Sequence, residues 1–585
     1  MASSTLIQER LEALRAQMAA QKLDGFLLPR TDEFQSEFLA PYAERVAYMT
    51  GFTGSAGYAV FLKDTALVAS DGRYTLQIRD QVDSSLYALA DSTQIKIPEW
   101  VADHVKKGGR VGYDPRLHSP SQISGYRALF DAKGIELVPL NDNLVDQVWK
   151  DAPSRPDAEI ILFDEKFAGR SAEQKRLLVA DKLQEKNLTH FVISAPDSIA
   201  WLLNIRSSDV AHTPVALSYA TITADGHVFW FINPDRVSDA IRAKLGNAVS
   251  LIPFDETEGE LSRIAADKGN HVGLDFKRAT SWFTQVLEKG AARVTDMEDP
   301  CIKLRACKVE AEREAMRIAH NRDGIVLTQF FDWLRAEAPK GALTEQHVVD
   351  ALTHARGTTG VLRDESFETI CGWQGNGAII HYRVTPETNK EIKGQGLLLI
   401  DSGAQYPDGT TDITRVIALN GTPTAEEKEA YTRVLKGHIA VARAKFPEGT
   451  TGAQIDALAR QPLWEAGLDF AHGTGHGVGV YLSVHEEATS ISPRSHDPIL
   501  EGMILSNEPG YYKEDAFGIR IENLVICYDT GEKLENGKRI FAFETITLVP
   551  FEDALIDKNL LTREEIDWVD AYHARCAENM KSNEN

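Results

Sequence analysis

Cysteine is scarce in this chain of 585 residues: it has five, an odd number, and no two have the CxxC spacing of a structural zinc site. This pattern excludes a disulfide framework and fits a reducing compartment. Apolar residues form no run of about 18, the length that crosses a bilayer, so no membrane span is predicted. Residues 1–21 show acidic side chains in an amphipathic helical pattern in place of the apolar core of a secretion signal. We therefore expect a cytoplasmic protein.

Basic residues are in the minority, because 63 Lys and Arg stand against 86 Asp and Glu and give a formal net charge of -23 at pH 7. Binding to nucleic acid needs a basic surface, so nucleic acid is not an expected partner. Apolar residues make up 43% of the chain, which is enough for several hydrophobic cores. At this length the sequence indicates two to four domains.

Two similar successions of helix, strand, helix and strand precede the last part of the chain. We predict a first domain over residues 1–155 and a second, related domain over 156–305, joined by the Pro- and Asp-rich linker KDAPSRPDAEI. A long amphipathic helix near VEAEREAMRIAH opens a third domain, 306–585, in which helices alternate with antiparallel strands. One of these helices follows Thr424 and has Glu427 in capping-box spacing. This pattern predicts the α+β class for the third domain.

Five candidate metal ligands lie in the last third of the chain, within DSGAQYPDGTTDITR, HGTGHGVG, SNEPGYY and FGIRIEN. Four carboxylates are too many for one divalent ion, but they balance two ions, and the imidazole adds a nitrogen ligand. The set therefore predicts a two-metal hydrolase. Its members are Asp401, Asp412, His476, Glu508 and Glu522.

Local patterns bring two of these carboxylates together. GQGLLLIDSG indicates a buried strand that ends at Asp401, and TTDITRVIAL alternates like its partner strand and carries Asp412. A single Asp at a strand end is more often a cap or turn residue. Two of them on either side of one hairpin can converge on one pair of ions.

The other three ligands have alternative interpretations. His476 lies among alternating glycines, as in a phosphate-binding loop, but the segment matches neither GxGxxG nor the P-loop. Glu508 precedes a Pro-Gly turn. Glu522 belongs to FGIRIENLVI, which alternates like one strand; it is either a surface residue or a buried carboxylate that needs a cation.

The order Asp, Asp, His, Glu, Glu, with GAIIHY upstream and VHE after the glycine loop, resembles metallopeptidases of the creatinase, prolidase and methionine aminopeptidase group. DSGAQYPDGTTDITR, HGTGHGVG, EPGYY and FGIRIEN are most similar to the three-domain Xaa-Pro aminopeptidases, and the likeness runs from about residue 20 to LTREEIDWVDAYH. The resemblance implies a C-terminal pita-bread domain after two related α/β creatinase-type domains. It also implies a cytosolic homodimer that removes the first residue from peptides with proline in second position.

The resemblance further implies a role for each ligand. Asp401 and Asp412 would bind the first metal, and the second would be held by Asp412, His476, Glu508 and Glu522. Two of them, Asp412 and Glu522, would bridge. Manganese is the metal that the resemblance favours, although oxygen-rich sites with one histidine also accept cobalt or zinc.

Residues outside the ligand set receive roles from the same resemblance. His381 in GAIIHYR and His485 in SVHEE would lie near the scissile bond, and His472 would line the proline pocket. Arg520, two residues before Glu522, would support the site. In the first domain, the arginine of DGRY, Arg73, would reach the bound peptide.

The chemistry also follows from the ligands themselves. Two divalent ions can share a water, lower its pKa and polarise the substrate carbonyl. His485 could then stabilise the oxyanion, and Glu508 could pass the proton to the leaving nitrogen.

One departure and two rival functions stand beside this interpretation. Arg383 in HYRV occupies a position where close relatives are expected to have a small residue, which puts substrate preference beyond the proline in doubt. A prolidase restricted to dipeptides is one rival, and the additional N-terminal repeat speaks against it. The other is a binding module that has lost its metals, which the intact ligand set disfavours.

Overall fold

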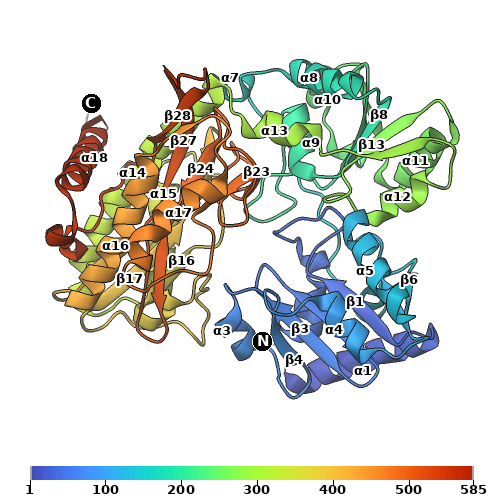
Figure 1. The fold of residues 1–585 in the computed structure, drawn as a ribbon, viewed down its shortest axis with the longest axis horizontal. Helices are drawn as coiled ribbons and strands as arrows, with labels where there is room; N and C mark the ends of the chain where they lie inside the picture. Colours follow the sequence, from blue (N-terminus) through green and yellow to red (C-terminus); the bar gives the residue numbers. More distant parts are fainter. Residues whose placement is uncertain (1–2, 583–585) are drawn as a thin grey trace. The chain divides into compact units, whose positions relative to one another are not determined.

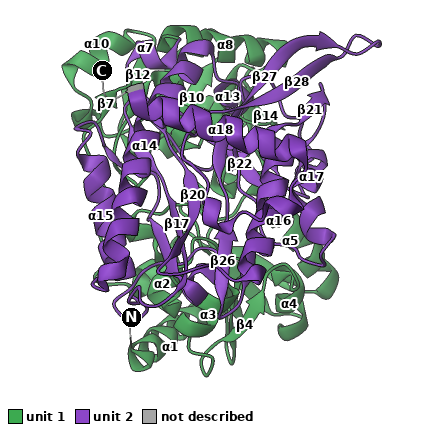
Figure 2. Ribbon diagram, turned by 90° about the vertical axis from the view of Figure 1, so that its left-hand side faces the viewer, with its two compact units in different colours: residues 1–163, 170–301 green, residues 164–169, 302–585 purple. Residues whose placement is uncertain are grey.

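The computed structural model describes residues 3–582, which fall into two units (Figure 2). Unit 1 consists of residues 1–163 and 170–301, and unit 2 of residues 164–169 and 302–585. Among the helices of the described residues, none combines the length and the apolar character needed to cross a bilayer. The predicted boundaries after residues 155 and 305 stay a prediction.

Unit 1 contains two six-stranded mixed sheets with the same topology (Figure 1). In the first, of order β4-β3-β2-β1-β5-β6, the central strand β1 is antiparallel to β2 and parallel to β5. In the second, of order β12-β11-β10-β8-β13-β14, β8 is likewise antiparallel to β10 and parallel to β13. The internal repeat predicted from the sequence is therefore confirmed.

The strands of the first sheet are β1 Gly25–Pro29, β2 Tyr58–Leu62, β3 Ala66–Ser70, β4 Ala88–Asp91, β5 Arg110–Tyr113 and β6 Glu136–Pro139. Those of the second are β8 His190–Ile193, β10 Tyr219–Thr223, β11 Val228–Phe231, β12 Val249–Ile252, β13 His271–Leu274 and β14 Arg293–Asp296. Two further strands of two residues each, β7 Ile161–Leu162 and β9 Ile205–Arg206, pair with each other outside these sheets. The helices of unit 1 are α1 Ser4–Ala20, α2 Arg45–Thr50, α3 Thr75–Gln81, α4 Ile97–His104, α5 Pro120–Lys133, α6 Leu144–Val148, α8 Ala172–Glu185, α9 Pro196–Leu203, α10 Asp239–Leu245, α11 Thr257–Ala266 and α12 Ser281–Leu287.

Both faces of the first sheet are covered. On β1, Phe26 packs with Leu14 of α1, whereas its neighbour Leu27 packs with Phe130 of α5 on the other face. Successive side chains of a strand point to opposite faces, so a strand buried on both sides must be apolar throughout. This is why GFLLP has no polar position.

Unit 2 is built from antiparallel sheets flanked by helices, the pita-bread arrangement (Figure 1). Its helices are α7 Glu165–Ala168, α13 Pro300–Ala306 (which begins in unit 1), α14 Glu310–Glu337, α15 Glu345–Gly357, α16 Ala425–Ala442, α17 Gly452–Trp464 and α18 Arg563–Ser582. A three-stranded sheet has the order β16-β17-β20, with β16 Ile370–Trp373, β17 Gly396–Ser402 and β20 Ile413–Leu419. A six-stranded sheet consists of β21 Lys445–Pro447, β28 Arg539–Thr545, β27 Asn523–Lys533, β24 Ile504–Asn507, β22 Gly475–Gly477 and β23 Glu486–Ile491. Small sheets are formed by β15 Asp364–Glu365, β18 Ala404–Tyr406 and β19 Gly409–Thr410, and by β25 Gly510–Lys513 with β26 Phe517–Arg520.

The apolar run of β17 is buried between two helical layers. Leu399 packs with Val434 of α16, and its neighbour Ile400 packs on the other face with Leu352 of α15. Asp401 is the penultimate residue of this strand, so a carboxylate follows directly on the apolar segment 396–400. The capping box predicted at the start of α16 is confirmed, since Thr424 and Glu427 exchange bonds between side chain and backbone.

The long helix predicted near VEAEREAMRIAH is confirmed as α14, which follows the shorter helix α13 after a break at residues 307–309. One predicted element differs from the structure. FGIRIENLVI forms two strands, β26 and β27, which belong to different sheets and leave Ile521 and Glu522 between them. The prediction of one continuous strand was wrong, because every residue of the segment is buried and the chain passes through a bend that changes the hydrogen-bonding partner.

Candidate metal centre

Asp401 and Asp412 lie at the same end of an antiparallel strand pair. In the register of β17 and β20, Asp401 is opposite Thr414, and Asp412 immediately precedes β20. The small β18–β19 hairpin fills the interval between them. A glycine is required where this hairpin leaves β17, because a Cβ at Gly403 would lie 2.0 Å from the backbone oxygen of Thr411.

Glu508 and Glu522 lie at a bend in a second pair of strands. Asn507, at the end of β24, pairs with Asn523 of β27, whereas β25 pairs with β26 in a separate sheet. Glu508 directly follows β24, and Glu522 directly precedes β27, so both lie where the chain changes from one sheet to the other. Backbone hydrogen bonds hold both residues: Glu508 N–H donates to Thr474 O at 2.7 Å, and Glu522 N–H donates to Thr414 O at 3.2 Å.

His476 is presented by the short strand β22. Its Nδ1 lies 2.9 Å from Gly477 O, and Nε2 lies 3.4 Å from Asp412 Oδ2 and 3.5 Å from Glu508 Oε1. The bond from Nδ1 to a carbonyl fixes the tautomer that leaves Nε2 as a ligand. One potential ligand atom from each of Asp412, His476 and Glu522 lies within 4.8 Å of the other two.

Burial and mutual repulsion perturb the ionisation of this cluster. Burial, reinforced by Asp412, raises the pKa of Glu522 well above its usual value. Burial likewise raises the pKa of Asp401 to about 7. Burial opposes the charge on His476, but ion pairs with Asp412 and Glu508 outweigh it and raise the pKa of the imidazole to about 9. Metal binding must therefore displace protons, and it strengthens as the pH rises.

The two oxygens of the Asp401 carboxylate have different surroundings. Arg520 donates to its Oδ2 from Nε at 3.1 Å and from Nη2 at 2.6 Å. The other oxygen, Oδ1, is buried and has no hydrogen-bond partner among the described residues. A buried carboxylate oxygen without a donor fits a cation ligand, so the residues present suit a metal ion at this position.

Arg520 also contacts an aromatic side chain, and its predicted supporting role stays a prediction. Its Nη1 donates to the Tyr512 hydroxyl at 2.7 Å, and that hydroxyl lies 2.8 Å from His472 Nε2. His472 also packs against Phe470, with ring centroids 4.8 Å apart. The Asp401 carboxylate is thus linked through Arg520 and Tyr512 to an aromatic wall.

The two other candidate histidines, His485 and His381, have different surroundings. The His485 ring meets the His476 ring edge-on, with centroids 4.3 Å apart, so it lies beside the ligand cluster. His381 is half-buried in the segment after the 3₁₀ turn Gln374–Ala378, and its place in the site stays a prediction. Arg383 pairs with Glu368 at 2.6 Å.

In unit 1, Arg73 forms an ion pair with Asp71, a residue of its own turn. Its Nε and Nη2 donate to the two oxygens of Asp71 at 2.9 and 2.8 Å, which holds the guanidinium as a planar fork. The predicted contact with a peptide stays a prediction.

Two contributors to the site were missed from the sequence. The Thr414 hydroxyl donates to Glu522 Oε2 at 2.8 Å and accepts from Arg520 Nε at 3.1 Å. Arg415 Nη1 donates to the backbone oxygen of Glu522 at 2.7 Å. Thr414 could have been found, because it lies two positions from Asp412 and therefore on the same face of the strand. Arg415 could not, because its partner is distant in sequence.

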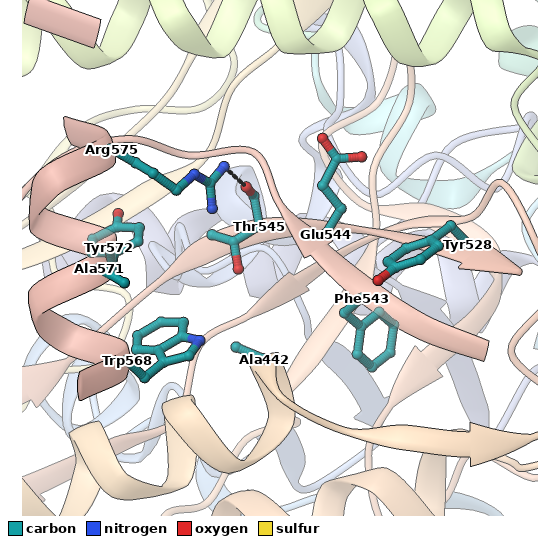
Figure 3. A pocket seen from close by; sticks show the side chains of 9 residues that line it. All are labelled: Ala442, Tyr528, Phe543, Glu544, Thr545, Trp568, Ala571, Tyr572 and Arg575. Atoms are coloured by element: carbon teal, nitrogen blue, oxygen red, sulfur yellow. Dashed lines mark hydrogen bonds between the residues drawn. The ribbon is translucent and has the colours of Figure 1, made fainter. Parts of the chain in front are cut away.

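A pocket of 370 Å³ lies elsewhere in unit 2, against α18 and β28 (Figure 3). Figure 3 shows Arg575 turned toward Thr545, whose backbone oxygen it bonds at 2.8 Å. None of the five candidate ligands lines this pocket. Its lining residues are Ala442, Tyr528, Phe543, Glu544, Thr545, Trp568, Ala571, Tyr572 and Arg575.

The fold and the buried carboxylate cluster together define a hydrolase of the metallopeptidase class. Family models agree: Metallopeptidase family M24 matches residues 314–529, and the C-terminal region of peptidase M24 matches 539–583. The Creatinase/Prolidase N-terminal domain is matched twice, over residues 10–148 and 151–312.

Similar proteins identify the family within the M24 metallopeptidases. Aminopeptidase P2 of Arabidopsis thaliana is 40% identical over 98% of this chain and 86% of its own length. A probable Xaa-Pro aminopeptidase P of Fusarium vanettenii is 39% identical over 97% of this chain and 95% of its own. The chain therefore belongs to the Xaa-Pro aminopeptidase P family of M24 metallopeptidases.

Solved structures agree with this assignment. The X-prolyl aminopeptidase of Caenorhabditis elegans, described as a cytosolic enzyme with a di-nuclear active site, matches with a TM-score of 0.93 and 33% identity over 99% of this chain and 96% of that one. The prolidase of Pyrococcus horikoshii shares the fold over 65% of this chain and 99% of its own, with a TM-score of 0.51 and 22% identity.

Proposed function

We propose that this protein is a metal-dependent aminopeptidase that removes the N-terminal residue from peptides with proline in second position. The observation that carries the proposal is the grouping of Asp412, His476 and Glu522, with Glu508 3.5 Å from His476, in a chain that matches Xaa-Pro aminopeptidases over nearly its whole length. The orphaned oxygen of Asp401 supports a metal-loaded site over a metal-free binding module.

The five ligands hold two divalent ions in this proposal, with manganese favoured over zinc or cobalt. Asp412 and Glu522 would bridge the ions. When bound, such a pair supplies a water of lowered pKa and Lewis acidity toward the scissile carbonyl. Glu508 would receive the proton of the water and pass it to the leaving nitrogen. His485, whose ring lies beside that of His476, would donate to the developing oxyanion.

Recognition of proline depends on an apolar wall in this proposal. An Xaa-Pro bond is a tertiary amide with no N–H, so the site cannot use that donor for binding and must grip the pyrrolidine ring. His472 lies between Phe470 and Tyr512, with ring centroids 4.8 and 5.4 Å away. These three rings suit the proline side chain.

Cleavage assays test the proposed function. We expect the manganese-loaded protein to release the first residue from Xaa-Pro-Xaa tripeptides and to leave Xaa-Ala-Xaa controls intact. Cleavage restricted to Xaa-Pro dipeptides would identify a prolidase instead. Absence of cleavage by protein that has bound metal would favour a binding module.

Replacing either proposed catalytic histidine should separate metal binding from chemistry. His381→Ala and His485→Ala are each expected to keep both metals and to lose about 10²-fold or more in kcat, the usual cost of one oxyanion donor. Metal analysis beside steady-state kinetics checks this result. A metal-depleted variant would mean that the replaced histidine is itself a ligand.

Arg73→Ala should weaken the binding of longer peptides in the cytosolic homodimer that we propose. Loss of one charge-assisted bond, about 1.5 kcal/mol, raises KM for tripeptides and longer substrates about tenfold while metal content and dimerisation stay unchanged. Asp71→Asn, which keeps the arginine and removes its ion pair, is the matched control and should have a smaller effect. Equal KM values across a series of peptide lengths would rule out the role of Arg73.

A further inference from the structure

A group of four charged side chains, three of them buried, joins the break between α13 and α14 to the start of β23. Lys308 lies in that break, and its Nζ donates to Glu486 Oε2. Arg305 approaches the other oxygen, with Nε 3.2 Å from Glu486 Oε1, and its Nη2 donates to Glu487 Oε2 at 2.6 Å. The side chains of Lys308 and Glu486 are 1% and 2% exposed. Two cations thus pair with two carboxylates, of which Glu486 is buried and Glu487 is 41% exposed.

Glu486 is the residue that follows His485, and its strand pairs with the strand of the metal ligand His476. In the register of β22 and β23, Glu486 is opposite Gly477, next to His476. The two strands are in close contact there, because a Cβ at Gly477 would lie 2.6 Å from Glu486 O. A displacement of Glu486 would therefore move the backbone on both sides of the edge-on ring pair His476–His485.

The carboxylate needs a nearby cation to stay in this place. A buried ionised glutamate is costly unless it is paired, and a neutral partner at position 308 would leave it only the longer contact with Arg305. Such a carboxylate moves toward water or takes up a proton. Either response releases the start of β23, which directly follows His485.

We propose that Lys308 and Arg305 are positioning residues for the reaction, which act through Glu486 to hold His485 against His476. The proposal rests on the proposed peptidase function and on the role of His485 in it. Lys308 does not touch the substrate or the metal ligands in this arrangement. Its backbone N–H donates to Gly502 O at 3.1 Å, a bond that a side-chain substitution leaves in place.

Lys308→Met tests the proposal in the full-length, manganese-loaded protein. We expect kcat for an Xaa-Pro-Xaa tripeptide to fall about 10- to 100-fold, since a misplacement of about 1 Å has this effect, with KM and bound metal unchanged. Lys308→Arg, which keeps a cation, should restore most of the rate. Lys436→Met is the matched control: it removes another Lys–Glu pair of unit 2, in which Lys436 Nζ lies 2.7 Å from Glu565, and should leave kcat unchanged.

A double-mutant cycle with His485→Ala separates positioning from a general loss of structure. If Lys308 acts through His485, Lys308→Met has no further effect on kcat once His485 is absent. Multiplicative losses, or an unchanged kcat in Lys308→Met, would overturn the proposal. If Lys308→Met does not fold, Glu486→Gln enters the same cycle with the same criterion. Failure of the wild-type protein to cleave Xaa-Pro-Xaa peptides would instead overturn the proposed function.

Discussion

Asp412→Ala is expected to lose nearly all bound metal and nearly all peptidase activity. As a proposed bridge it serves both ions, so its removal withdraws transition-state stabilisation worth several kcal/mol, which corresponds to about 10³-fold or more in rate. Glu522→Ala should behave in the same way. His476→Ala should lose less metal, because this ligand serves one ion. Metal content by mass spectrometry and kcat/KM by peptide cleavage measure the difference.

Two controls accompany these variants. Asp408 lies in the same hairpin as Asp412, is buried and pairs with Arg322 at 2.7 Å, so Asp408→Asn should keep its metal. Treatment of the wild-type protein with a chelator should leave it folded but inactive, and manganese should restore activity, since the cores of the chain are large enough to fold without metal. Equal metal loss in Asp412→Ala and His476→Ala would contradict the bridging assignment.

Arg356→Met should have the largest effect on stability. Arg356 of α15 and Asp323 of α14 form a bidentate ion pair, in which Nε donates to Oδ1 at 2.9 Å and Nη2 donates to Oδ2 at 3.0 Å. Their side chains are 0% and 3% exposed. Removing one member leaves a buried charge, which costs about 3–5 kcal/mol. Asp323 also accepts hydrogen bonds from Tyr406 at 2.9 Å and from Thr411 at 2.7 Å, so the hairpin between the two aspartates proposed to bind metal loosens with it.

Denaturant unfolding of unit 2 at several pH values checks this stability effect. Burial raises the pKa of Asp323, but Arg356 outweighs burial and holds it below the usual value. In the wild type this stabilisation is present above the unfolded-state pKa of about 3.9 and is lost as the pH falls through the lower folded-state pKa. Arg322→Met, which breaks the more exposed pair with Asp408, should cost about 1 kcal/mol or less. A similar cost in both variants would show that burial of the Arg356 pair contributes nothing.

Local patterns in the sequence were sufficient for the repeat, for the strand that carries Asp401 near its end and for the helix capped by Thr424. Each is encoded by neighbouring residues: apolar runs, 3.6-residue periodicity, or a cap with its partner three positions on. The sequence also predicted the types of ligand, because burying four carboxylates and His476 together without cations costs much free energy.

The tertiary structure alone decided how those ligands are supported. The bend that places Glu522 between two sheets does not interrupt the alternation of FGIRIENLVI, so periodicity could not reveal it. The bond from Arg415 to Glu522 O and the ion pair of Lys308 with Glu486 join residues that are 107 and 178 positions apart. A single sequence records that these groups need partners, since each is costly to bury alone, but only the folded chain determines which partner each one meets.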